Sequence, residues 1–138
     1  MQPIPKRRLY HSDSVSKYHP FKSTKFAFAG LVYAFRTEPN LVIQLMIGLS
    51  FFLFNLFAGQ LILAVANLIF MAITMGFEIF NTALENICDL VNPELNNRVK
   101  IIKDLSAGAV LIVALVWLLI IVFSIVQEIF HFNFREIL

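Results

Sequence analysis

Residues 39–77 read PNLVIQLMIGLSFFLFNLFAGQLILAVANLIFMAITMGF and contain not one Lys, Arg, Asp or Glu. A helix needs roughly 20 apolar residues to cross the hydrocarbon core of a membrane. The run is therefore long enough for two spans, with a short uncharged turn at Ala58, Gly59 and Gln60. A second charge-free run, residues 105–127, suits a single span. The sequence predicts three membrane-spanning helices.

The overall composition supports this interpretation. The chain has 138 residues, of which 59% are hydrophobic and 14% are charged. A soluble domain of this length cannot hide so much apolar surface, so lipid must be its solvent. We expect an all-α integral membrane protein with one domain over residues 21–127. Its predicted parts are a flexible basic tail (1–20), a surface helix (21–36), spans at about 41–56, 61–90 and 105–126, and a short tail (128–138).

Basic residues precede the first span and set the expected topology. They are Lys6, Arg7, Arg8, Lys17, Lys22, Lys25 and Arg36. Under the positive-inside rule this arm is cytoplasmic, and the apolar and basic pattern of residues 21–36 suits a helix at the membrane surface. Anionic lipid explains such an arm, so we expect membrane lipids rather than nucleic acid as its partner. Cys88 is a lone thiol, which excludes an intrachain disulfide and favours a buried structural role.

Carboxylates near a membrane span are costly unless they are paired, hydrated or functional. The end of the second span carries Glu78, Asn81, Thr82, Glu85 and Asp89. At 3.6 residues per turn, these five side chains share an arc of about 100°. This acidic stripe is therefore predicted to face protein, water or a metal rather than lipid.

Other charged residues fall at the same predicted depth. Glu38 begins the first span, and Lys103 and Asp104 begin the third. Clustered carboxylates suit a hard divalent cation, since Mg²⁺ prefers one or two carboxylates plus phosphate oxygens, and a neighbouring lysine suits a polyphosphate. The pattern indicates a metal–nucleotide site at the membrane surface. The alternative is that these charges anchor the topology or bond a neighbouring helix.

The residues around these positions resemble a known family. Residues 78–85 (EIFNTALE), Asp89 and residues 103–110 (KDLSAGAV) are similar to the prokaryotic diacylglycerol kinase family, which includes the undecaprenol kinases. Residues 29–38 (AGLVYAFRTE) resemble the family's surface helix and its entry into the first span. The resemblance extends from about residue 21 to residue 126.

The resemblance implies a homotrimer in the bacterial plasma membrane, with multi-pass subunits that transfer the γ-phosphate of Mg-ATP to a lipid alcohol. By position, Glu78 would be the general base and Asn81 would position the reacting groups. Glu38 and Glu85 would hold Mg²⁺, and Lys103 and Asp104 would contact ATP. These roles agree with what phosphoryl transfer requires, namely positioning, charge neutralisation and one oriented base.

One departure concerns the nucleotide. The family usually carries a Tyr-His step before the Lys-Asp pair, whereas this chain has Leu95 and Asn96, which leaves the nucleotide preference open. The lipid is expected to be undecaprenol, followed by diacylglycerol, because residues 33–38 and 100–103 look more like the undecaprenol branch. The alternative function is a non-enzymatic three-span protein, such as a small cation or proton transporter subunit, with the acidic stripe as the ion path.

Overall fold

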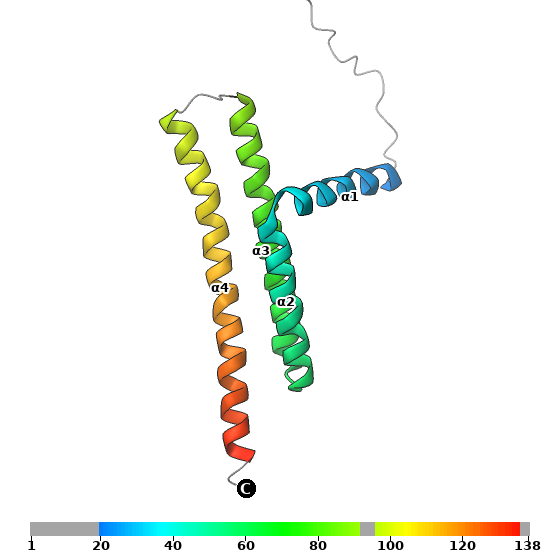
Figure 1. Ribbon diagram of the computed structural model, residues 1–138, viewed down its shortest axis with the longest axis vertical. Coiled ribbons are helices and arrows are strands. Elements are labelled where there is room, and N and C mark those ends of the chain that lie inside the picture. Colours follow the sequence, from blue (N-terminus) through cyan, green and yellow to red (C-terminus); the bar gives the residue numbers. More distant parts are fainter. Residues whose placement is uncertain (1–19, 92–95, 136–138) are drawn as a thin grey trace, which may run out of the picture. The chain divides into compact units, whose positions relative to one another are not determined.

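The computed structural model describes residues 20–91 and 96–135, and all of its regular structure in these ranges is helical. Four helices follow in order (Figure 1): α1 Pro20–Thr37, α2 Pro39–Phe57, α3 Leu61–Val91 and α4 Asn97–Arg135. The expected tail of residues 1–20, apart from Pro20, and the loop residues 92–95 lie outside the described residues. Helix α1 covers the predicted surface helix of residues 21–36.

The chain divides into two units between Tyr33 and Ala34, within α1. We therefore describe the second unit, which contains α2, α3 and α4, by itself. Each of these three helices is long and apolar enough to cross a membrane, over Pro39–Phe57, Leu61–Val91 and Asn97–Phe130. The prediction of an all-α fold with three apolar spans is confirmed.

A tight turn joins α2 to α3 because Gly59 adopts a positive φ of 73°. This left-handed conformation costs glycine nothing, since it has no Cβ. The backbone N–H of Gly59 donates to the carbonyl of Leu56 at 3.1 Å, and that of Gln60 donates to Asn55 at 2.8 Å. These bonds satisfy carbonyls that the end of α2 would otherwise leave without partners.

Helix α4 is longer at both ends than the predicted span of residues 105–126. It begins at Asn97 because Asn96 caps it: the Arg98 N–H donates to Asn96 Oδ1 at 2.9 Å. Asparagine is among the best N-cap residues, and here it starts the helix before residue 105, where the predicted span begins. It continues to Arg135, through much of the expected short tail of residues 128–138, because no Gly or Pro follows Gly108 to end it.

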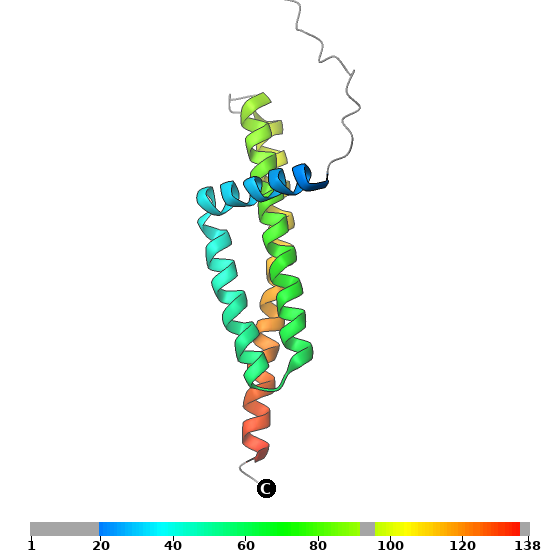
Figure 2. The same ribbon diagram turned by 90° about the vertical axis from the view of Figure 1, so that its right-hand side faces the viewer.

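Helix α3 packs against both α2 and α4, which places it at the centre of the unit (Figures 1 and 2). A buried polar contact joins all three helices. Asn67 of α3 donates from Nδ2 to the Gly48 carbonyl of α2 at 2.7 Å, and its Oδ1 accepts from Trp117 Nε1 of α4 at 2.8 Å. Since Asn67 is fully buried, these bonds fix how the helices are rotated and aligned.

Candidate functional site

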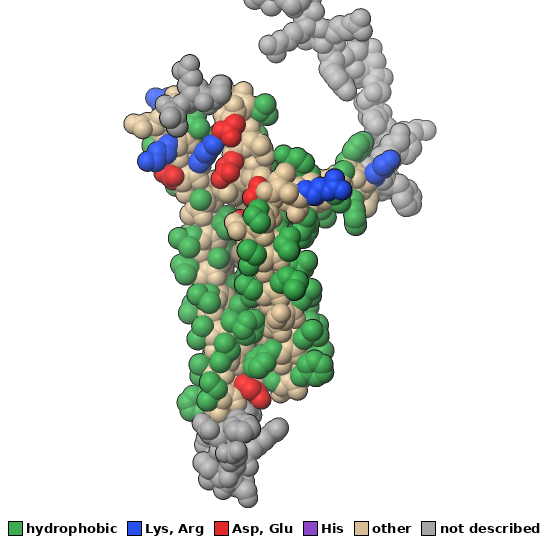
Figure 3. Space-filling model, in the orientation of Figure 1, with side chains coloured by type: hydrophobic (Ala, Val, Ile, Leu, Met, Phe, Trp, Pro, Cys, Tyr) green, Lys and Arg blue, Asp and Glu red, His purple; other side chains and the backbone are tan. Residues whose placement is uncertain are grey.

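The carboxyl-terminal part of α3 carries the acidic stripe, and the structure shows what its side chains contact. Acidic and basic side chains gather over the ends of α3 and α4 that meet the connection between them, whereas apolar side chains cover the lengths of these helices (Figure 3). Helical periodicity alone brings Asn81 to Glu85, whose Oε1 accepts a hydrogen bond from Asn81 Nδ2 at 3.0 Å. Asn81 and Glu85 therefore lie on the same face of α3, as predicted.

Glu78 is the most buried of these carboxylates, with 8% of its surface exposed. Its Oε1 accepts a hydrogen bond from Asn40 Nδ2 in the first turn of α2 at 2.9 Å. A buried ionised carboxylate needs such donors, because desolvation otherwise disfavours its charge. The bond aims Glu78 towards the start of α2, where Pro39 occupies the first helical turn and Glu38 precedes it.

Glu38 itself stands at the N-cap of α2 but does not cap it. Its backbone is extended, with φ −114° and ψ 98°, and its side chain makes no capping hydrogen bond within the described part of the chain. The side chain is half-buried. Its carboxylate therefore makes no capping bond to α2 and lies at the start of that helix, close in sequence to Asn40, which reaches Glu78.

Two further contacts connect the stripe to α4. Lys103 Nζ forms an ion pair with Asp89 Oδ1 at 2.6 Å, between side chains that are 34% and 65% exposed. Ser106 Oγ lies 2.6 Å from Asn81 Oδ1. Asp104, beside Lys103, is exposed. The structure therefore brings Lys103 to the acidic stripe through Asp89.

Asn40 and Ser106 were missed by the sequence argument. Asn40 is a polar residue at the start of an apolar run, and Ser106 lies about one helical turn after Lys103. Both contacts cross between helices, over 38 and 25 positions of sequence. Helical periodicity within α3 carries no information about such partners.

The donor chemistry of this site fits Mg²⁺, although the described residues contain no group of three or more His, Cys, Asp or Glu that could hold a metal. Mg²⁺ is usually bound by one or two carboxylates, with phosphate and water completing its shell. Among described residues, Asn81 occupies only Oε1 of Glu85 and leaves Oε2 for a cation. Cys88 is free and buried, as predicted, and its structural role stays a prediction.

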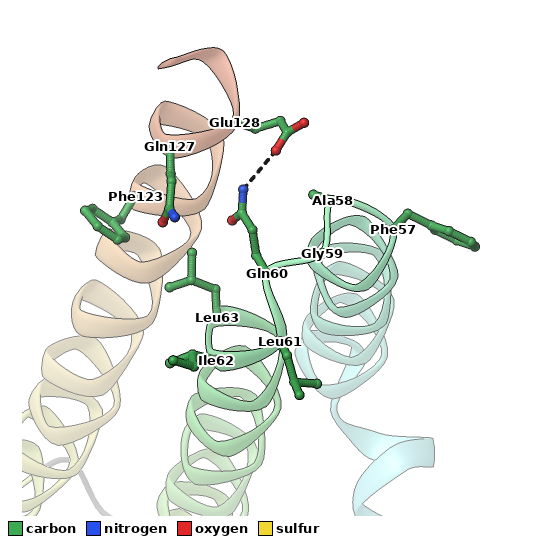
Figure 4. Close-up of a pocket in the computed structure, with 10 residues that line it drawn as sticks. All are labelled: Phe57, Ala58, Gly59, Gln60, Leu61, Ile62, Leu63, Phe123, Gln127 and Glu128. Atoms are coloured by element: carbon green, nitrogen blue, oxygen red, sulfur yellow. Dashed lines mark hydrogen bonds between the residues drawn. The ribbon is translucent and has the colours of Figure 1, made fainter. Parts of the chain in front are cut away.

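A cavity of about 910 Å³ lies at the opposite end of the unit, where the α2–α3 turn meets α4 (Figure 4). Here Gln60 Nε2 donates to Glu128 Oε2 at 2.9 Å. The carboxylates of the acidic stripe lie at the other end of α3. This cavity is therefore separate from the candidate site.

The sequence matches the prokaryotic diacylglycerol kinase family over residues 25–125, a range that includes all of the acidic stripe, Lys103 and Ser106. The chain belongs to the prokaryotic diacylglycerol kinase family. It is also 37% identical, over 95 residues, to a protein named diacylglycerol kinase from Synechocystis sp.. That similarity covers 67% of this chain and 54% of the relative, so the chain spans about half the length of that protein. No solved structure matches the chain.

Membership of this family and the three apolar helices together identify an all-α membrane protein. The matched range begins within α1 and ends within α4, so the family region covers parts of both units. Glu38, Asn40 and Glu78 all fall inside it. The hydrogen bonds of Glu78 with Asn40 and of Asn81 with Ser106 are thus contacts within the family's own region.

Proposed function

We propose that this chain is a lipid kinase that transfers the γ-phosphate of Mg-ATP to a membrane lipid alcohol, with undecaprenol preferred and diacylglycerol next. The observation that carries the proposal is the pairing of Glu78 with Asn40 where the apolar helix α2 begins, part-way along α3. It supplies a buried, oriented carboxylate, and we propose that the lipid hydroxyl meets the water-soluble nucleotide there. The family membership supports the same reaction class.

In the proposed reaction, Glu78 acts as the general base. Its carboxylate takes the proton of the lipid hydroxyl as that oxygen bonds to the γ-phosphorus. The bond from the γ-phosphorus to the bridging oxygen breaks, and ADP leaves with the electron pair. Asn40 holds one oxygen of Glu78, so the other is free to receive the proton. A positioned base contributes about 10²–10⁴-fold to such a step.

Glu38 and Glu85 are the proposed ligands of Mg²⁺, with Lys103 and Asp104 at the nucleotide. When bound, Mg²⁺ neutralises charge on the phosphates. Asn81 keeps Glu85 in place through its 3.0 Å hydrogen bond. Lys103 forms an ion pair with Asp89 at 2.6 Å. The phosphates of the bound nucleotide would compete with Asp89 for this ammonium group. We further propose a homotrimer in the bacterial plasma membrane with a cytoplasmic amino terminus.

An apolar groove of about 550 Å³ between α3 and α4 supports a lipid substrate. Asn81 and Ser106 are among its lining residues, and its lining surface is almost wholly apolar. Its other lining residues are Ile73, Gly76, Phe77, Phe80, Leu84 and Ala109. A long lipid chain gains free energy from such surface in proportion to the apolar area that it covers.

The experiment that tests this function is phosphate transfer from radiolabelled ATP in mixed micelles that contain Mg²⁺ and either undecaprenol or diacylglycerol. We expect labelled lipid, with undecaprenol the better acceptor. Labelled diacylglycerol alone would reverse the lipid assignment. No product from either lipid, together with Na⁺ or H⁺ flux through reconstituted protein, would replace the kinase with the transporter alternative.

A further inference from the structure

Ser106 is the residue through which α4 contacts the amide that holds Glu85. Its Oγ lies 2.6 Å from Asn81 Oδ1 and 2.9 Å from the carbonyl oxygen of Lys103. Both neighbours are acceptors, and a serine hydroxyl has one proton. The contact with Lys103 stays within α4, as is common for serine in helices, whereas the shorter contact crosses to α3.

The direction of these hydrogen bonds is set by chemistry. An ionised carboxylate only accepts, so the group of Asn81 that faces Glu85 must be its NH₂. The oxygen of the same amide then faces Ser106, which must donate. The result is two hydrogen bonds in series. The Ser106 hydroxyl donates to Asn81 Oδ1, and Asn81 Nδ2 donates to Glu85 Oε1 at 3.0 Å.

The Glu85 carboxylate excludes the alternative orientation of the Asn81 amide. If Asn81 were rotated by 180°, its oxygen would face the Glu85 carboxylate, which has no proton to give. Asn81 and Ser106 are both half-buried, so water replaces a lost partner only in part, and an unpaired buried acceptor costs about 1–3 kcal/mol. With the amide held in this orientation, the Ser106 hydroxyl pairs with Asn81 Oδ1 and so stabilises the position from which Asn81 restrains Glu85.

We propose that Ser106 is a positioning residue for the metal ligand Glu85, acting through the amide of Asn81. This inference rests on the proposed function, because it takes Glu85 as a ligand of the nucleotide-bound cation. Groups that orient metal ligands through hydrogen bonds typically change metal affinity about 10–100-fold when removed. Loss of the Ser106 hydroxyl accordingly weakens cation binding without removing any ligand.

The test uses the full chain in detergent micelles and measures Mn²⁺ binding by electron paramagnetic resonance in the presence of a non-hydrolysable ATP analogue. Mn²⁺ replaces Mg²⁺ because both prefer oxygen ligands. Ser106→Ala is expected to raise the half-saturating Mn²⁺ concentration about tenfold. Ser106→Thr keeps the hydroxyl, so its Mn²⁺ affinity is expected to stay near that of the wild type.

Two controls separate positioning from a loss of packing. Ser124→Ala removes a buried hydroxyl from the same helix, where Oγ bonds only the Ile120 carbonyl at 2.9 Å among described residues, and is expected to leave Mn²⁺ binding unchanged. In an Asn81→Ala background, Ser106→Ala is expected to cause no further loss of Mn²⁺ affinity, because the series of hydrogen bonds from Ser106 to Glu85 is already interrupted. If Ser106→Ala does not fold, Ser106→Cys, a weaker donor of similar size, takes its place.

The proposal is overturned if Ser106→Ala binds Mn²⁺ as the wild type does, if Ser124→Ala shows the same loss, or if the Ser106 and Asn81 effects add. Lipid phosphorylation by the wild type, measured in parallel, distinguishes a failure of the role proposed for Ser106 from a failure of the proposed kinase function. A wild type that phosphorylates lipid while Ser106→Ala keeps its Mn²⁺ affinity refutes the role of Ser106 alone. A wild type that neither transfers phosphate nor binds Mn²⁺ with the nucleotide refutes the proposed function as well.

Discussion

At the scale of single residues, three carboxylates of the site are each held by an amide or ammonium group. Glu78 is held by Asn40, Glu85 by Asn81 and Asp89 by Lys103. Each donor keeps a negative charge in place at the end of an apolar helix. Removal of a donor is therefore expected to disturb the chemistry before it disturbs the fold.

The first prediction concerns Asn40. Asn40→Ala removes the 2.9 Å hydrogen bond to Glu78, so the base loses its fixed orientation. We expect kcat for lipid phosphorylation to fall about tenfold, because misplaced catalytic groups lose much of their effective concentration. The apparent affinity for ATP should change little.

The matched control is Asn86→Ala. Asn86 is exposed and donates to the Thr82 carbonyl of its own helix at 2.9 Å, so its loss should leave kcat near that of the wild type. Steady-state rates in mixed micelles check both variants. Equal rates for Asn40→Ala and the wild type would remove Asn40 from the account.

The second prediction concerns Glu85. Glu85→Gln replaces a charged ligand with a neutral one of the same size, so the Mg²⁺ concentration for half-maximal rate should rise about tenfold or more. Glu128→Gln makes the same change at the other end of the unit, in the cavity beside Gln60, and should leave the Mg²⁺ titration unchanged. Coincident titrations of Glu85→Gln and the wild type would exclude Glu85 as a ligand.

At the scale of elements, periodicity predicted which residues share a face but not what that face meets. Asn81 and Glu85 were expected together because they are four apart on one helix, and they are hydrogen-bonded. The partners Asn40 and Ser106 depend on how α2 and α4 are rotated against α3, which local sequence does not specify. The early start of α4 had a local signal in Asn96, an N-cap residue that lies outside the predicted span of residues 105–126.

The third prediction tests the contact that joins the helices. Trp117→Phe removes the donor that reaches Asn67 Oδ1 at 2.8 Å and leaves a buried acceptor unpaired. We expect a loss of about 1 kcal/mol in the free energy of unfolding, since hydrogen bonds between membrane helices average about 0.6 and reach about 1.7 kcal/mol. Unfolding by sodium dodecyl sulfate in mixed micelles measures this loss.

A double-mutant cycle shows whether the loss belongs to this bond. In an Asn67→Ala background, Trp117→Phe should cost clearly less than it does alone. Additive losses would mean that the two side chains stabilise the unit independently, and that their bond does not align α3 with α4.

At the scale of the whole molecule, the three apolar helices leave much large hydrophobic surface exposed, including Phe80, Leu105 and Leu119 at 73%, 69% and 68%. Lipid or further copies of the chain cover such surface in a membrane.

The fourth prediction is that native mass spectrometry of the protein released from detergent micelles gives the mass of three chains. A single-chain mass in active samples would contradict the proposed homotrimer.

We propose that the acidic part of α3 performs phosphoryl transfer with Glu78 as its base. The most direct test compares initial rates of lipid phosphorylation by the wild type, Glu78→Gln and the control Glu128→Gln, with ATP binding measured on the same preparations. We expect Glu78→Gln to lose at least about 100-fold in rate while it still binds ATP, and Glu128→Gln to match the wild type. A Glu78→Gln rate near that of the wild type would contradict the account.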